Sequence, residues 1–413
     1  MKKIILLFIA ITASVHSSTA QWQQTGLDSM IINCVAVYGK NVFACPWDTA
    51  VLISKDKGAS WTTINNGPTY PIWSIESNGT TIYAGGYAGV FLSKDSGITW
   101  SATSITDISR VETIAVSWPN IFARTSKEFL LSTDNGITWE VVSKTGLPDN
   151  ASIISVVACG ENIFAGTESD GIFLSIDSCR SWIALNNNGL PYADTVFASV
   201  DFLTVVGTNI FAVIYNKHIG GNEVYLSTDN GESWTSVNKG LPNTGIYNGL
   251  TVNGTNVFAH SHGEGVFLFN SNDTSWTEIN TGVLNTSVHS LAVSETEIYA
   301  ATCGSGVFKR LLSDITGTND VSTPCLPDRQ ALSMTSVYPN PATNYIEIET
   351  SSQAIIEILN IQGQLTLPAG RQVKTHTASG DKTSVDISAF PNGMYFVKVK
   401  NEKGIEVKKF VKQ

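Results

Sequence analysis

The chain has 413 residues, a length that accommodates two or three ordinary domains or one closed repeat array with an appendage. It is 42% hydrophobic and only 15% charged, a composition that suits many short strands joined by polar turns. The net charge of −10 argues against nucleic acid as a partner, because phosphate binding needs a basic surface.

Residues 1–20 have the pattern of a secretory signal peptide. Two lysines precede the apolar run 4–13, and Ser18, Thr19 and Ala20 are the small residues of a cleavage site, so the mature chain is expected to begin at Gln21. The alternative is a membrane anchor, but a bilayer needs about 20 apolar residues and this run is shorter. We therefore predict export to the periplasm and no transmembrane segment.

An eight-residue turn, Ser-x-Asp-x-Gly-x-Ser/Thr-Trp, recurs along the chain, and we call it the box turn. A fourth copy has Cys179 in place of the glycine, and a sixth keeps only Ser275 and Trp276. The glycine allows a positive φ, and the short polar side chains bond the turn's own backbone, so a structural role is favoured over a catalytic or calcium site. The defining residues are Asp56, Gly58, Trp61, Asp95, Gly97, Trp100, Asp134, Gly136, Trp139, Asp177, Trp182, Asp229, Gly231 and Trp234.

The tryptophans of successive box turns lie 39, 39, 43, 52 and 42 residues apart. Four apolar stretches of four to seven residues fall in each interval, and a four-stranded unit of this period is typical of a β-propeller blade. The seventh unit has no box turn and no fourth strand, whereas residues 21–27 resemble an orphan fourth strand. We therefore predict a seven-bladed propeller over residues 21–313, closed by its N-terminal strand. The first strands are expected to begin near Ile32, Ile72, Val111, Ile153, Val200, Tyr247 and Val288.

The box turns resemble the Asp-box, or bacterial neuraminidase repeat, of sialidases, xyloglucan-cleaving glycosidases, sortilin-like receptors and photosystem-assembly propellers. This resemblance implies the fold but no single function, because enzymes and binding proteins share it. A sialidase would need three clamping arginines. The propeller region has only Arg110, Arg124, Arg180 and Arg310, of which Arg180 lies within a box turn and Arg310 in the last strand, and no Arg-Ile-Pro segment precedes the first box turn, which argues against that activity. A glycoside hydrolase would need two carboxylates about 5–10 Å apart; Glu112 and Asp201, at equivalent places in two blades, are the candidate pair.

The loops that join strand 4 to the next strand 1, and strand 2 to strand 3, form the face of a propeller that commonly carries function. The residue near the start of each first strand varies in this chain, and we predict a glycan or protein ligand there, bound by Trp73, Glu112, Asp201, Asn248 and His289. The longest loop between strands 2 and 3, residues 215–222 of blade five, is another candidate contact. His260 and His262, with His218, would be the start of a metal site, but no ligand set is complete, so we predict no metal and no cofactor.

Six cysteines in an exported chain permit disulfides, and none has the spacing of a metal ligand pair. Cys34 and Cys45 flank one predicted hairpin turn symmetrically, and Cys303 has Cys325 as a possible partner. Fifteen pairings remain open.

The repeat stops after residue 313, and a linker over residues 314–336 precedes a predicted small β-sandwich at 337–413. This tail resembles the type A C-terminal sorting domain of the type IX secretion system, with an extra loop at 366–372. The residues that carry the resemblance are Tyr338, Pro339, Asn340, Pro341, Gly393, Tyr395, Lys409, Phe410 and Val411. The resemblance implies recognition by the secretion machinery and delivery to the outer surface or medium; the alternative is a carbohydrate-binding sandwich.

Taken together, the sequence predicts an exported propeller that acts as a binding or interaction scaffold. The competing hypothesis is a polysaccharide-active glycoside hydrolase that uses Glu112 and Asp201.

Overall fold

The computed structural model describes residues 21–316, 336–338, 342–349, 354–359, 382–401 and 404–413. Short gaps within these ranges fall at residues 65, 69–70, 80, 104, 106–109, 118–119, 160–161, 186–188, 194–195, 198, 218 and 244. The expected signal peptide and most of the expected linker lie outside the described residues.

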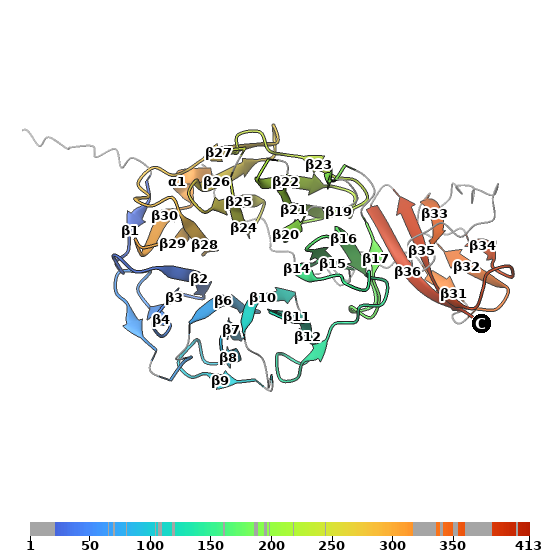
Figure 1. Ribbon diagram of the computed structural model, residues 1–413, viewed down its shortest axis with the longest axis horizontal. Helices are drawn as coiled ribbons and strands as arrows, with labels where there is room; N and C mark the ends of the chain where they lie inside the picture. Colours follow the sequence, from blue (N-terminus) through green and yellow to red (C-terminus); the bar gives the residue numbers. More distant parts are fainter. Residues whose placement is uncertain are drawn as a thin grey trace, which may run out of the picture.

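Seven four-stranded antiparallel sheets are arranged in a ring, as Figure 1 shows in blue through orange. Blade 1 contains β2 (Ile32–Tyr38), β3 (Asn41–Pro46), β4 (Leu52–Ser54) and β5 (Thr62–Thr63). Blade 2 contains β6 (Ile72–Ser77), β7 (Ile82–Gly86), β8 (Gly89–Ser93) and β9 (Ser101–Ala102). Blade 3 contains β10 (Val111–Ser117), β11 (Asn120–Thr125), β12 (Phe129–Ser132) and β13 (Glu140–Val141). Blade 4 contains β14 (Ile153–Cys159), β15 (Asn162–Thr167), β16 (Ile172–Ser175) and β17 (Ile183–Ala184).

The remaining blades follow the same order. Blade 5 contains β20 (Ser199–Val206), β21 (Asn209–Asn216), β22 (Gly221–Ser227) and β23 (Thr235–Ser236), and the short hairpin β18 (Tyr192–Ala193) and β19 (Val196–Phe197) precedes it. Blade 6 contains β24 (Tyr247–Asn253), β25 (Asn256–Ser261), β26 (Gly265–Asn270) and β27 (Ser275–Glu278). Blade 7 contains β28 (Val288–Val293), β29 (Glu297–Thr302), β30 (Val307–Leu311) and β1 (Gln23–Gln24), and α1 (Ser313–Thr316) follows it.

The N-terminal strand closes the ring, as the sequence predicts. In β1, Gln23 pairs with Lys309 and Gln24 with Phe308 of β30. The Trp22 indole donates a 2.7 Å hydrogen bond to the backbone oxygen of Ile279 in blade 6, and Arg310 Nη1 donates to the same oxygen at 3.0 Å. The two ends of the propeller are therefore fastened to each other and to the preceding blade.

The strand boundaries agree with the prediction at the centre of the ring and differ at its rim. Six of the seven innermost strands begin at the expected residue, and β20 begins one residue earlier, at Ser199. The outermost strands were expected to contain four to seven residues, but six of them have two; only β27, which follows the degenerate box turn, has four. Such short outer strands leave little free edge for pairing with another chain.

The recurring phrase Asn-Ile/Val-Phe-Ala forms the second strand of a blade and supplies the core. Its aromatic residues are at most 2% exposed, and each packs in the interface between neighbouring blades. These residues are Phe43, Phe122, Phe164, Phe211 and Phe258, with Tyr83 and Tyr299 at the equivalent positions of the other two blades. Burial of one large ring per blade accounts for the regular spacing of the repeat.

The box turns are closed hydrogen-bonded units. In the first, Ser54 Oγ donates to Asp56 Oδ1 and accepts from the Gly58 amide, both at 2.7 Å. The Asp56 carboxylate accepts from the Ser60 amide at 2.8 Å and from the Ser60 hydroxyl at 2.6 Å. These bonds, led by the hydroxyl, lower the pKa of Asp56 to about 2. The carboxylate thus stabilises its own turn, as the structural interpretation predicts.

The copy with cysteine keeps the same geometry. The Cys179 amide donates to Ser175 Oγ at 2.9 Å, and Cys179 adopts a φ of 64°, in the region that the glycines of the other copies occupy. The Cys179 side chain is buried in the core cluster that also contains Trp182. This burial offsets the free-energy cost of placing a residue other than glycine in the left-handed region.

The cysteines of the first hairpin are neighbours, as their symmetry predicts. Cys34 and Cys45 are directly paired across β2 and β3, both are buried, and both are free thiols in this structure. Cys325 lies outside the described residues.

The tail forms two three-stranded sheets, drawn in orange and red in Figure 1. One contains β31 (Ser336–Tyr338), β32 (Tyr345–Glu349) and β34 (Lys382–Asp386). The other contains β33 (Ala354–Leu359), β35 (Gly393–Asn401) and β36 (Gly404–Lys412). Alternate residues such as Ile346, Ile358, Val397 and Phe410 are fully buried between them, which makes the predicted β-sandwich.

Candidate functional site

Every innermost strand carries one β-bulge near its start. In blade 1, Ile32 pairs with Pro46 and Cys34 with Cys45, so Asn33 between them has no cross-strand partner. The same irregularity recurs in the other six blades. The bulged residues are Asn33, Trp73, Glu112, Ile154, Asp201, Asn248 and His289. A bulge redirects the side chain it carries and is frequent next to functional sites, and all five nominated ligand contacts occupy this position.

Three bulged side chains fasten neighbouring blades. Each uses a side-chain nitrogen to contact the backbone oxygen of the first residue of the next innermost strand. The contacts are Asn33 Nδ2 to Ile72 O (3.2 Å), Asn248 Nδ2 to Val288 O (2.8 Å) and His289 Nδ1 to Ile32 O (3.1 Å). In Asn248 and His289, these contacts engage one side-chain nitrogen each.

Blades 2 and 3 bring together five side chains that we call the aromatic–arginine cluster: Trp73, Tyr87, Arg110, Glu112 and Arg124. The Trp73 and Tyr87 rings lie 4.4 Å apart with an interplanar angle of 62°. The Arg110 guanidinium carbon lies 4.4 Å from the centre of the Trp73 ring, within the range of a cation–π interaction. Trp73 is thus the support on which an arginine and a second aromatic ring rest.

One carboxylate serves two guanidinium groups in this cluster. Glu112 Oε1 lies 3.6 Å from Arg110 Nε, and Glu112 Oε2 lies 3.4 Å from Arg124 Nη2. The arginine side chains are 43% and 34% exposed, so the pairs face solvent. The cluster contains two arginines and one glutamate, so one positive charge is not neutralised within it. The sequence analysis identified Trp73 and Glu112 as ligand contacts but not Tyr87, Arg110 and Arg124. The position of Arg110 directly before the first strand of blade 3 was a signal that could have identified it.

Asp201 sits in a different environment. Its carboxylate accepts hydrogen bonds from Ser199 Oγ at 2.5 Å and from Asn222 Nδ2 at 2.8 Å. Asn222 in turn accepts from the Tyr247 amide of blade 6 at 3.2 Å. Within the described part of the chain, no recorded hydrogen bond or ion pair joins Asp201 to Glu112.

A third carboxyl group lies on an innermost strand, on Glu76 of β6. The residue is solvent-exposed, and partial desolvation of its carboxyl group by the atoms around it raises the pKa to about 7. A carboxyl group with such a pKa is suited to hold a proton near neutral pH. Sequence reasoning did not nominate it, because a single glutamate in a strand carries no local signal.

Histidines gather where blades 6 and 7 meet. The rings of His262 and His289 are 5.8 Å apart. His260 of β25 is buried, and this burial lowers its pKa to about 4. Among the described residues, no group of three His, Cys, Asp or Glu is placed to hold a metal ion, and His218 lies outside them.

Exposed apolar side chains are concentrated on the loop face. Apart from residues in box turns, outer strand ends and the tail, the large hydrophobic side chains that are at least 41% exposed come from the 4–1 and 2–3 loops. These are Ile31, Trp47, Tyr87, Ile219, Ile246 and Leu284. These side chains place apolar groups on the loop face where a ligand could contact them.

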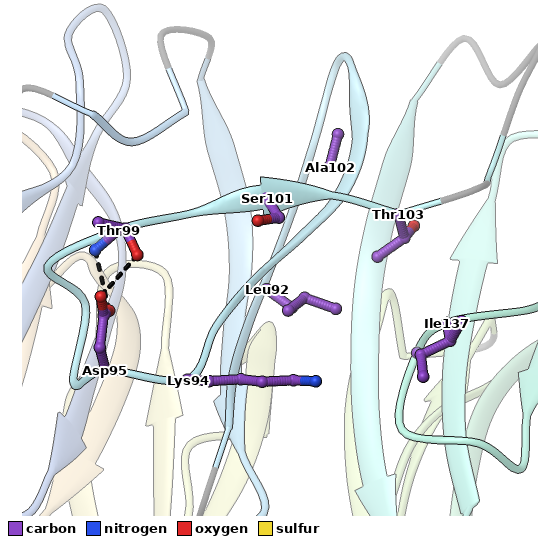
Figure 2. Close-up of a pocket in the computed structure, with 9 residues that line it drawn as sticks. Leu92, Lys94, Asp95, Thr99, Ser101, Ala102, Thr103 and Ile137 are labelled. Atoms are coloured by element: carbon purple, nitrogen blue, oxygen red, sulfur yellow. Dashed lines mark hydrogen bonds between the residues drawn. The ribbon is translucent and has the colours of Figure 1, made fainter.

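The structure also contains a groove of about 530 Å³ between blades 2 and 3, shown in Figure 2. It lies at the box turns, which the antiparallel topology places on the opposite face from the aromatic–arginine cluster. Lys94 and Ile137 line it, while the Asp95 carboxylate turns to Thr99 of its own turn, as the dashed lines in Figure 2 show. Since that carboxylate is already occupied, the groove offers less chemistry than the loop face.

The tail residues that carry the sorting resemblance have structural positions. Phe410 is fully buried and stacks on Tyr395 with ring centres 5.5 Å apart, and the Tyr395 hydroxyl donates to Pro391 O at 2.9 Å. Gly393 and Val411 lie in the paired strands β35 and β36, as does the backbone of Lys409. The Lys382 ammonium lies 5.1 Å from the centre of the Tyr338 ring; Pro339, Asn340 and Pro341 are outside the described residues.

Comparison with known proteins separates the two parts of the chain. The family model of the secretion system C-terminal sorting domain matches residues 336–413. No curated protein sequence matches the chain. No helix among the described residues is long and apolar enough to cross a membrane.

Several solved structures share the propeller fold. The extracellular domain of the one component system BT4673 from B. thetaiotaomicron has a TM-score of 0.56 and 14% identity, over 94% of this chain and 52% of that one. The structure of YCF48 bound to D1 peptide has a TM-score of 0.53 and 12% identity, over 74% of this chain and 98% of that one. The structure of U3-55K has a TM-score of 0.53 and 11% identity, over 70% of this chain and 98% of that one. The chain spans about half the length of the BT4673 domain, and at these identities the likeness concerns the fold alone.

The sorting-domain match indicates export by the type IX secretion system, and hence a secreted or cell-surface protein. The chain is a seven-bladed β-propeller protein that ends in a C-terminal sorting domain of the type IX secretion system.

Proposed function

We propose that the propeller is a binding scaffold that acts at or beyond the cell surface and holds a glycan or protein ligand on its loop face. The observation that carries this proposal is the aromatic–arginine cluster, in which exposed Tyr87 and Arg110 both rest on Trp73. Aromatic and charged groups that are held in place before the ligand arrives lower the entropic cost of binding.

The environments of the two candidate catalytic carboxylates favour binding over hydrolysis. Glu112 is paired with Arg110 and Arg124, and Asp201 is held by Ser199 and Asn222. Both carboxylates are thus already engaged by side chains of the protein itself. Hydrolysis with Glu112 and Asp201 is therefore the competing outcome of the test below.

The proposal includes the organisation of the whole chain. Residues 1–20 act as the signal peptide that delivers the chain to the periplasm, and residues 21–313 form an Asp-box propeller. Residues 314–336 link it to the sorting tail at 337–413, which the secretion machinery recognises. Trp73, Glu112, Asp201, Asn248 and His289 contribute to ligand contact, with the additional residues Tyr87, Arg110 and Arg124.

The test is a screen of the purified protein for binding and for reducing-sugar release on plant and microbial glycans. Tyr87→Ala is compared with Ile137→Ala, which removes an equally exposed apolar side chain from the opposite face. We expect binding without turnover, weakened about tenfold by Tyr87→Ala, since loss of a stacked aromatic contact costs about 1–1.5 kcal/mol, and unchanged by Ile137→Ala. Sugar release that disappears in the Glu112→Gln/Asp201→Asn double variant would instead establish a glycoside hydrolase.

A further inference from the structure

We propose that the aromatic–arginine cluster binds an acidic polysaccharide, with the anionic group of a sugar on Arg110 and Arg124 and its ring against Tyr87. This inference rests on the proposed function and specifies the ligand chemistry of the same site.

The charge balance of the cluster favours an anionic ligand. Arg110 and Arg124 share the single carboxylate of Glu112 at 3.6 and 3.4 Å, which are distances of ion pairs rather than of short hydrogen bonds. Each ion pair engages one nitrogen of its guanidinium group, Arg110 Nε or Arg124 Nη2, and the two arginine side chains are 43% and 34% exposed. The other guanidinium nitrogens can therefore donate to a carboxylate or sulfate, which guanidinium groups bind in a planar two-point geometry. In a chain of net charge −10, such a site is a local exception.

The aromatic residues indicate a saccharide rather than an acidic peptide. Tyr87 is 49% exposed beside the charged groups, and Trp47, 55% exposed, lies in the equivalent 2–3 loop of the adjacent blade 1. Exposed rings on neighbouring blades suit a chain of sugar units, each of which has an apolar face. An extended peptide commonly adds to a free strand edge, and the outer edges of six of the seven blades offer only two-residue strands.

Glu112 has an opposite role from the arginines in this scheme. Its carboxylate occupies the guanidinium groups in the free protein and repels an incoming anion. Removing its charge is therefore expected to strengthen binding of an acidic glycan, whereas removing either arginine charge weakens it. A purely structural or catalytic role of Glu112 would not produce this opposition of sign.

The experiment measures the affinity of the full exported chain for polygalacturonate and for the same polymer after methyl esterification, which removes the charge and keeps the sugar. Dextran sulfate and dextran form a second matched pair that distinguishes sulfate from carboxylate. Polyglutamate tests an acidic peptide. The variants are Arg124→Met, Tyr87→Ala and Glu112→Gln, with Arg180→Met as the control, because Arg180 is an exposed arginine in a box turn on the opposite face. Thermal unfolding of each variant verifies that the propeller remains folded.

We expect polygalacturonate or dextran sulfate to bind and its uncharged counterpart not to bind. Arg124→Met should weaken the affinity about tenfold, equivalent to about 1.4 kcal/mol, Glu112→Gln should strengthen it several-fold, and Arg180→Met should leave it unchanged. Equal affinity for the charged and esterified polymers, or for polyglutamate, would overturn this inference, as would no binding of either acidic polymer. If a neutral glycan binds and Tyr87→Ala abolishes this binding, the proposed function stands without the specificity for anionic ligands. If binding is insensitive to every loop-face variant, both proposals fail.

Discussion

The indole nitrogen of Trp182 in blade 4 donates a 2.8 Å hydrogen bond to the backbone oxygen of Ser143 in blade 3. The Trp182 amide donates to Thr145 O at 2.9 Å, and Gly146 has a φ of 89°, where an added Cβ would lie 2.1 Å from the Trp182 oxygen. Residues 143–146 therefore hold both the ring and the backbone of this tryptophan. Trp276 and Trp22 are held by the preceding blade in the same way, whereas the indoles of Trp100 and Trp139 donate to Gly97 and Gly136 of their own box turns.

This difference predicts unequal roles for the tryptophans. Trp182→Phe removes the indole donor and leaves Ser143 O unpaired at a blade interface, which should lower the free energy of unfolding by about 1–3 kcal/mol. Trp100→Phe should cost less than about 1 kcal/mol, because Trp100 is half-buried and its bond is local. Urea unfolding of both variants measures the difference. Equal losses would mean that the blade-to-blade bond contributes nothing beyond burial of the ring.

A second prediction separates backbone strain from steric collision at two turn glycines with positive φ, Gly97 of a box turn and Gly39 of the β2–β3 hairpin. Gly97 has a φ of 85°, and an added Cβ would lie 2.4 Å from the Phe43 ring, so Gly97→Ala should destabilise the fold by more than about 3 kcal/mol. Gly39 also has a positive φ, 57°, but a Cβ there meets nothing within 4 Å, so Gly39→Ala should cost only about 1 kcal/mol. Thermal unfolding compares the two. A similar cost for both would show that the box turn moves away from Phe43.

The third prediction concerns the closure of the ring. The Glu297 side chain is buried. Its carboxylate oxygens lie 3.2 Å from Lys57 Nζ of blade 1 and 3.7 Å from Lys309 Nζ, and they accept a 3.0 Å hydrogen bond from the Tyr299 hydroxyl. Glu297→Gln should reduce stability by about 1–2 kcal/mol, a value lowered by the exposure of Lys57. Lys239→Met removes a comparable but exposed pair with Asp273 and should change stability by less than about 0.5 kcal/mol.

Unfolding midpoints in 0.05 and 1 M salt test this prediction, because salt screens the exposed pair more than the buried one. An identical salt response of the two variants would contradict it.

The fourth prediction concerns acid stability. The box-turn hydrogen bonds lower the pKa of Asp56, Asp95 and Asp134 to about 2, below the value of 3.8 expected in the unfolded chain. Because the folded-state pKa is depressed, the stabilisation is fully present above about pH 4 and is lost as the pH falls through about 2. A triple Asp→Asn variant should be less stable at neutral pH and should show a shallower fall in stability between pH 4 and 2. Denaturant titrations across this range measure the slope; an unchanged slope would assign the acid response to other carboxylates.

The fifth prediction links packing in the tail to export. Phe410 is fully buried against Tyr395, so Phe410→Ala should cost about 3–5 kcal/mol and unfold the small sandwich. Because a sorting signal must present a folded surface, we expect the variant to accumulate in the periplasm. Tyr345→Ala, at a side chain that is 51% exposed, should be exported normally. Cell fractionation with an antibody against the propeller measures both, and normal export of Phe410→Ala would show that the signal is read from the strand sequence instead.

The sequence alone determined the features that depend on short residue patterns repeated in each blade. The tryptophan spacing and the box-turn pattern predicted seven blades, because each turn is closed by hydrogen bonds within eight residues, as between Asp56 and Ser60. The orphan strand with Trp22 predicted ring closure, since a seventh blade without a fourth strand needs one. The bulged positions of the seven blades, from Asn33 to His289, could also be matched to one another from the sequence. Each directly follows the residue at which the repeat predicts the first strand of its blade to begin.

Only the tertiary structure decided what those positions contact. Arg110, Glu112 and Arg124 converge with Trp73 and Tyr87 because a bulge redirects one side chain in each blade and the ring places blade 2 beside blade 3. Asn248 and His289, nominated as ligand contacts, donate to or contact the next blade for the same reason. The shortness of the outer strands was not readable either, because the apolar runs after the box turns extend beyond the two residues that pair in most blades. Local hydrogen bonds repeat with the sequence, whereas contacts between blades exist only after the ring has closed.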